Sequence, residues 1–116
     1  NGIGGHIEDK EGSYAAMVRE FKEECGIETA PIDWDYFACM FDKGKSFEKG
    51  WSVECFFCVL EDEVFNSAET KTDEILFIAN IEKLNSRTDI IPNLSWLIPF
   101  AIDNILTGLK DASIQY

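Results

Sequence analysis

Three glutamates in one short segment are the residues of this chain best suited to chemistry. Glu20 lies three residues before Glu23 and four before Glu24, and this spacing gathers their side chains on one face of a helix. Like charges this close raise one another's pKa and destabilise the helix unless a cation neutralises them. Hard divalent cations prefer such oxygen ligands. The spacing therefore predicts a Mg²⁺ or Mn²⁺ site, with a solvated acidic helix face as the plainer alternative.

The three glutamates belong to a longer pattern that solvation of a helix face does not explain. The pattern is G-x5-E-x7-R-E-U-x-E-E-x-G-U, where U is apolar, and it begins at Gly5 and continues through Glu11, Arg19 and Gly26. At ordinary residue frequencies such a match arises by chance in roughly one chain in a million. Gly5 leaves room for the backbone to approach a ligand, and Gly26 is suited to end a helix.

This pattern resembles the signature box of the Nudix hydrolases, enzymes that cleave nucleoside diphosphates linked to another group. The resemblance implies that Glu20, Glu23, Glu24 and Arg19 are the catalytic residues. It also implies that the three glutamates bind the metal together with the carbonyl oxygen of Gly5.

The resemblance further implies an internal ion pair between Glu11 in the loop and Arg19 in the helix. The residues alone leave a second interpretation open, in which Arg19 is a surface partner of Glu23 four residues later.

The residues before the box suggest a branch of the family. Asn1-Gly2-Ile3-Gly4-Gly5 is similar to the branch that includes the 8-oxo-dGTP diphosphatases, which implies that Asn1 reads a purine base. An amide offers both a donor and an acceptor to a base edge. The alternative, weighted equally, is that Asn1 shapes an Asn-Gly turn. That branch has a pair of acids before its last helix, whereas Asn93 is the only polar base-reading candidate here.

A fourth carboxylate from a distant loop often completes the site in this family. Asp73 and Glu74 are the candidates, ahead of Glu61 and Glu63, and a surface role is the alternative for each.

These residues predict a Mg²⁺-dependent nucleotide pyrophosphohydrolase that cleaves a nucleoside triphosphate to monophosphate and pyrophosphate. An oxidised purine nucleotide is one candidate substrate. A second hypothesis keeps the chemistry and takes ADP-ribose, a nucleotide sugar or a dinucleotide as substrate. A third is a Nudix-fold nucleotide sensor without turnover, because fold alone does not establish function.

Composition limits the partners that this protein can have. The chain has 116 residues, enough for one domain, and its 22 acidic against 10 basic residues give a net charge of −12. This charge argues against a nucleic-acid polymer or an anionic membrane as partner. No apolar run is long enough to cross a membrane, and four cysteines fit a reducing cytoplasm. A homodimer is the candidate assembly, although the sequence leaves the oligomeric state open.

The elements expected to hold these residues suggest an α/β fold. We expect a helix from Ser13 to Cys25 with Ser13 as its N-cap, followed by strands over 35–41 and 51–60 that are joined by a polar hairpin loop. Glu74 to Ala79 is predicted to be a third strand. Residues 81–84 are expected to form a turn.

A second long helix is expected from Leu94 to Leu109, with a core stripe of Trp96, Leu97, Phe100, Ile105 and Leu109. Helices on both faces of a mixed sheet are similar to the Nudix α/β/α sandwich. Because strands precede the box in that fold, one or more N-terminal strands are expected to lie before Asn1.

Overall fold

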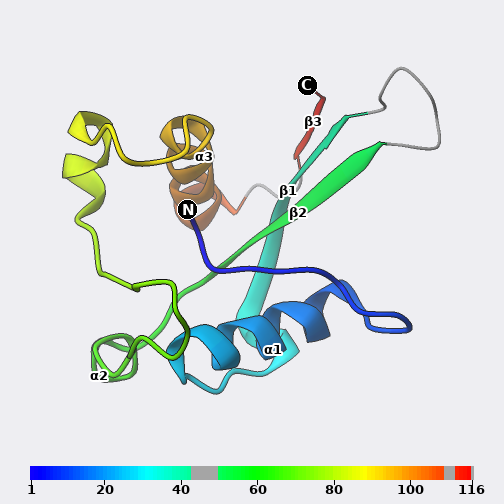
Figure 1. The fold of residues 1–116 in the computed structure, drawn as a ribbon. Helices are drawn as coiled ribbons and strands as arrows, with labels where there is room; N and C mark the ends of the chain where they lie inside the picture. Colours follow the sequence, from blue (N-terminus) through cyan, green and yellow to red (C-terminus); the bar gives the residue numbers. More distant parts are fainter. Residues whose placement is uncertain (43–49, 109–111, 116) are drawn as a thin grey trace.

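The computed structural model describes residues 1–42, 50–108 and 112–115, and shows a mixed α/β fold (Figure 1). Its regular elements are three α-helices, three strands and two 3₁₀ helices, in chain order α1 (Ser13–Cys25), η1 (Pro31–Asp33), β1 (Trp34–Asp42), β2 (Trp51–Cys58), α2 (Asp62–Phe65), η2 (Ile81–Ser86), α3 (Leu94–Thr107) and β3 (Ala112–Gln115).

The sheet is mixed, with strand order β2-β1-β3. β1 pairs antiparallel with β2, so that Trp34 lies opposite Cys58 and Asp42 lies opposite Trp51. β1 pairs parallel with β3. The register between β1 and β2 shifts between Tyr36 and Ala38, as a β-bulge requires. The antiparallel pairing agrees with the expected hairpin, although residues 43–49 of its loop lie outside the described residues.

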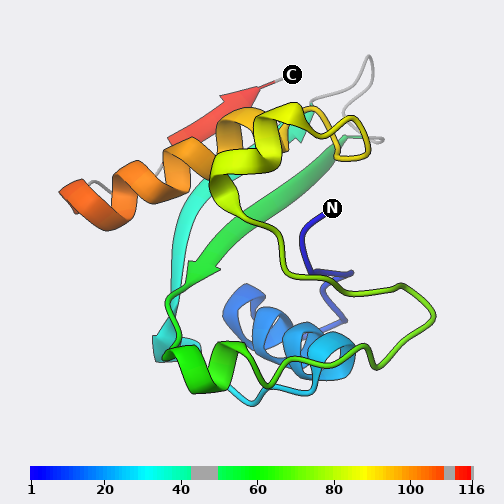
Figure 2. The ribbon, with the colours of Figure 1, turned by 90° about the vertical axis from the view of Figure 1, so that its left-hand side faces the viewer.

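Two helices lie on opposite faces of this sheet, and aromatic pairs show which face each one contacts. The ring of Phe56 lies 4.9 Å from Tyr14 of α1, whereas its neighbour Phe57 lies 5.7 Å from Phe37. Phe37 in turn lies 6.0 Å from Phe100 of α3. Consecutive residues of a strand point to opposite faces, so α1 and α3 cover different faces, and Figure 2 shows the strands passing between them.

The core lies between the sheet and α3. Phe37, Ala38, Met40 and Leu97 are buried there, and partly buried apolar side chains surround them: Cys55, Phe57, Leu94, Trp96, Phe100 and Ala101.

The predicted core stripe of α3 is only partly correct. Ile105 is 48% exposed. The helix ends at Thr107 because Gly108 adopts a left-handed conformation with φ 70°, and Leu109 lies outside the described residues.

The predicted strand from Glu74 to Ala79 is wrong: Glu74 lies in a bend, and residues 75–79 pair with no strand of the described structure. The side chain of Thr70 explains why. Its Oγ1 accepts a hydrogen bond from the amide of Leu76 at 3.0 Å and donates to the carbonyl of the same residue at 3.5 Å. Local side-chain bonds of this kind compete with a sheet ladder for the backbone.

Two smaller predictions also need correction. The N-cap of α1 is Gly12 rather than Ser13, and it makes no side-chain capping bond. The expected turn at 81–84 is the 3₁₀ helix η2. The side chain of Asn80 caps its N-terminus by accepting a hydrogen bond from the amide of Glu82. Among the described residues, no helix is both long and apolar enough to span a bilayer.

Candidate active site

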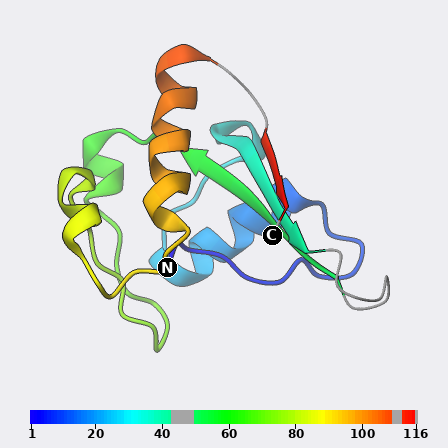
Figure 3. The same ribbon diagram turned by 90° about the horizontal axis from the view of Figure 1, so that it is seen from above.

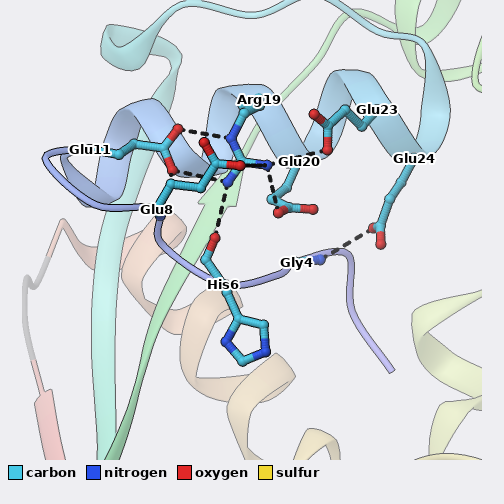
Figure 4. Close-up of polar contacts among 8 residues, drawn as sticks. All are labelled: Gly4, His6, Glu8, Glu11, Arg19, Glu20, Glu23 and Glu24. Carbon is cyan, nitrogen blue, oxygen red and sulfur yellow. Dashed lines mark hydrogen bonds and ion pairs between the residues drawn. The ribbon is translucent and has the colours of Figure 1, made fainter.

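The candidate site is built from α1 and the loop before it. Ser13 to Cys25 form a helix because good helix formers fill the segment and Gly26, at φ 79°, ends it with a bond from its amide to Lys22 O. Two bonds between Glu8 and Glu11 close a turn within the loop: the amide of Glu8 donates to the carboxylate of Glu11, and the amide of Glu11 donates to the carbonyl of Glu8. Figure 4 shows the loop running beside the helix.

Arg19 joins the loop to the helix. Its guanidinium forms a bidentate contact with Glu11, with Nε to Oε2 at 2.8 Å and Nη2 to Oε1 at 2.9 Å, and Nη2 also donates to the carbonyl of His6 at 3.0 Å. The hydrogen bonds from Arg19 are the main reason that the pKa of Glu11 falls to about 2. Glu11 and then Glu20 raise the pKa of Arg19. The structure therefore contains the ion pair that the resemblance implied.

The same guanidinium also contacts two of the three glutamates (Figure 4). Nη1 donates to Oε1 of Glu20 at 2.8 Å and to Oε2 of Glu23 at 3.2 Å. The surface contact with Glu23, which the residues alone left open, thus exists beside the pair with Glu11. Glu20 is mostly buried, with 16% of its side chain exposed, whereas the side chain of Glu23 is 57% exposed.

Gly5 and Gly4 bring the loop backbone against the other side of the glutamates. A Cβ at position 5 would lie 2.3 Å from Oε1 of Glu20, so the carboxylate occupies the space that any other residue would fill. The amide of Gly4 donates to Oε2 of Glu24 at 3.3 Å. Backbone rather than side chains therefore lines this part of the site.

Glu24 lies in the most crowded part of the site, and its pKa is raised. Partial burial is the largest cause, and repulsion from Glu20, Glu74 and Glu23 adds to it, against the lowering effect of the amide of Gly4. Burial and the neighbouring carboxylates therefore both favour the protonated form of Glu24.

Glu74 comes near Glu24 because the loop that carries it is hydrogen-bonded to the end of α1. The amide of Glu69 donates to Cys25 O at 3.0 Å, and that of Lys71 donates to Glu24 O at 3.1 Å. Asp73, the other candidate, is exposed and does not contribute to the charge around Glu24.

The two candidate base-reading residues form hydrogen bonds to groups other than the three glutamates. Oδ1 of Asn1 accepts a bond from the amide of Gly2 at 2.9 Å, which agrees with the turn interpretation. Asn93 lies at the start of α3, where Nδ2 contacts Met40 Sδ at 3.5 Å and Oδ1 is buried without a partner. In the described structure neither asparagine bonds to the other or to the three glutamates.

The donor set suits a hard divalent cation chemically, because it consists of carboxylates and backbone oxygens. Among the described residues, however, no three carboxylate, His or Cys side chains converge as a metal site. The contacts of Arg19 explain the difference, because Glu20 and Glu23 both direct an oxygen to its Nη1. These two carboxylates would have to turn from Arg19 to share a metal ion with Glu24.

Comparison with known protein families agrees with this arrangement. The NUDIX domain family matches residues 1–96, which include the box, the sheet strands β1 and β2 and the loop that carries Glu74. The chain belongs to the Nudix family. Nudix proteins are mostly hydrolases and typically depend on a divalent metal. Neither a curated protein nor a solved structure matched the chain.

Sequence reasoning missed two loop contributions to this Nudix site. The carboxylate of Glu8 lies 3.9 Å from Nη1 of Arg19, and the carbonyl of His6 accepts from Nη2. The position of Glu8, three residues before Glu11, was a signal for the first contact. A backbone carbonyl has no side-chain signal, so nothing in the sequence pointed to the second.

Proposed function

We propose that this Nudix protein is a divalent-metal-dependent pyrophosphohydrolase that cleaves a nucleoside triphosphate to monophosphate and pyrophosphate. The observation that carries the proposal is the close approach of the loop backbone to the helix carboxylates: Glu20 fills the space beside Gly5, and the amide of Gly4 donates to Glu24 at 3.3 Å. Partial burial and the carboxylates of Glu20, Glu74 and Glu23 also raise the pKa of Glu24. Such a group of oxygens gains most from a divalent cation.

Glu20, Glu23 and Glu24, with the carbonyl of Gly5, would hold the cation. When bound, the cation neutralises the bridging phosphates of the substrate and lowers the pKa of a bound water. Glu20 would orient that water or accept its proton for in-line attack on phosphorus. Arg19, whose guanidinium Glu11 fixes through two bonds, holds Glu20 and Glu23 in the metal-free arrangement, and the two carboxylates would turn from it to the cation.

Glu74 is our candidate for the fourth carboxylate. It acts on the charge of Glu24, whereas Asp73, next to it in the chain, does not. Substituting each by its amide separates the two. Glu74→Gln should lower kcat by about tenfold or more, and Asp73→Asn should change it by less than about twofold, since Glu74 is the one of the two that raises the pKa of Glu24.

The central experiment measures pyrophosphate release from a panel of nucleoside triphosphates with Mg²⁺. Glu20→Gln and Glu24→Gln should each reduce kcat by about 10²-fold or more. Glu28→Gln is the matched control, because Glu28 is an exposed glutamate near the same helix end whose carboxylate pairs with Lys22 at 2.7 Å. Full activity of Glu20→Gln would refute the proposal.

The products distinguish the remaining alternatives. Two phosphate monoesters from ADP-ribose, a nucleotide sugar or a dinucleotide would change the substrate class and keep the chemistry. Nucleotide binding without any product would identify a sensor.

A further inference from the structure

Helix α3 has an apolar surface that the core uses only at Leu94. Leu97, Phe100 and Ala101 face the sheet, but the helix is apolar on its other side as well. That side carries a stripe with a spacing of four residues: Leu94, Ile98, Ile102 and Leu106. A helix that is apolar all round is normally buried on every side. Here Leu106 is 79% exposed.

The 3₁₀ helix η2 covers this stripe only in part. Figure 3 shows α3 between the sheet and η2. Ile81 and Leu84 of η2 form one wall and the stripe forms the other, and between them lies an open groove of about 380 Å³. The stripe runs for about 18 Å at the rise of an α-helix, which is enough for three turns of a second helix.

The charged side chains that line the groove are acidic. Glu82 and Asp103 line it, and among the described residues that line it none is basic. Pro99, also in the lining, has no amide hydrogen and so cannot donate to the carbonyl of Ser95 one turn earlier. A ligand that fits this groove must therefore have apolar side chains to pack against the stripe and cationic side chains to pair with Glu82 and Asp103.

A second copy of this chain does not meet that requirement, because it also carries a net charge of −12 and would be repelled. We propose that the groove between η2 and α3 binds an amphipathic helix of a partner protein, with Lys or Arg beside its apolar stripe. Such a helix lays its apolar face into a groove of this kind. The site is separate from the three glutamates, so the proposal does not depend on the hydrolase activity.

The test uses the full chain and a fluorescent synthetic peptide of about 18 residues, long enough to form a helix. Its sequence places Leu on one face and Lys on both flanks, and a second peptide has Glu in place of every Lys. Fluorescence anisotropy should show saturable binding of the Lys peptide and no saturable binding of the Glu peptide. Binding should weaken as salt rises, because the rim charges are exposed.

Matched variants locate the binding. Leu106→Lys adds a cation inside the groove and should weaken binding by about tenfold or more. Ile32→Lys makes the same change in charge at a residue that is 91% exposed outside the groove, and should weaken it by less than about twofold. Because both side chains are largely exposed, neither change should alter the thermal midpoint by much.

Several results would overturn the proposal. It would be contradicted if the Lys peptide showed no saturable binding, or if the Glu peptide bound as tightly as the Lys peptide. It would also be contradicted if Leu106→Lys and Ile32→Lys weakened binding equally. Self-association in sedimentation that Leu106→Lys abolishes would show that the occupant is a second copy instead.

Discussion

At the scale of single residues, Gly5 is the position where one added carbon disturbs the site most. The Cβ of Gly5→Ala would lie 2.3 Å from the carboxylate of Glu20. The end of a glutamate side chain can move, so the fold should survive while the carboxylate is displaced. We expect kcat to fall by about 10²-fold, because misplacing a catalytic group by 1 Å can have this effect.

Gly2→Ala is the control for this change, because a Cβ at Gly2 has no atom within 4 Å. Pyrophosphate release and thermal melting of both variants provide the measurement. Equal kcat values for the two variants would show that Glu20 does not need its position against Gly5.

The bidentate pair of Arg19 and Glu11 predicts how stability changes in acid. The pKa of Glu11 falls from 4.5 to about 2 in the folded chain. A lowered carboxyl pKa contributes stability that is fully present above the unfolded value and is lost as pH falls toward the folded one. Between pH 4.5 and 2 the wild type should therefore lose stability more steeply than Glu11→Gln.

Urea unfolding at a series of pH values measures this difference. Glu69→Gln is the comparison, because Glu69 pairs with Lys71 at 2.8 Å but both side chains are largely exposed, where ion pairs contribute little. If the free energy of unfolding fell equally steeply with pH in the wild type and in Glu11→Gln, the role given to the ion pair would be contradicted.

At the scale of elements, the end of α1 fixes the loop that carries Glu74. Gly26 has φ 79°, and a Cβ there would lie 2.9 Å from Cε of Lys71. Gly26→Ala should lower the free energy of unfolding by about 1 kcal/mol or more, because a side chain is strained in the left-handed region. It should also loosen the loop and reduce kcat.

Gly12→Ser tests the other end of the same helix. Gly12 is the N-cap, with an ordinary φ of −76° and free space around its Cα, and serine is at least as good an N-cap as glycine, so the free energy of unfolding should change by only about a few tenths of a kcal/mol. Chemical denaturation compares the two variants. Similar losses at both ends would mean that backbone strain is not the cause.

At the scale of the whole molecule, the net charge of −12 makes the protein sensitive to cations. A ligand that binds only the folded chain raises its thermal midpoint. Millimolar MgCl₂ should therefore raise the midpoint more than NaCl of equal ionic strength, which only screens charge. In Glu24→Gln, MgCl₂ should raise the thermal midpoint no more than NaCl does, whereas Glu28→Gln should show the same additional rise with MgCl₂ as the wild type.

The same comparison has a second readout without added Mg²⁺. Because partial burial and, to a lesser extent, the neighbouring carboxylates raise the pKa of Glu24, its charge destabilises the metal-free fold at neutral pH. Glu24→Gln should then be more stable than the wild type by about 0.5 kcal/mol, the size of a like-charge pair on a helix. A lower stability in the absence of Mg²⁺ would contradict this view of the site.

The sequence by itself determined the local parts of this protein. The bounds of α1 and the common face of Glu20, Glu23 and Glu24 follow from helix geometry, which acts over three or four residues. The pairing of β1 with β2 follows from two strand-forming segments joined by a short polar loop. The amphipathic pattern likewise predicted most of α3.

Only the tertiary structure decided what lies next to these elements. It placed Glu74 near Glu24 and packed Gly5 against Glu20. It also shows that the third strand of the sheet is β3 and not the segment 74–79. These outcomes depend on bonds between distant or irregular segments, such as Lys71 to Glu24 and Thr70 to Leu76. No residue period in the chain encodes such bonds, because each of them forms only after the backbone has folded back on itself.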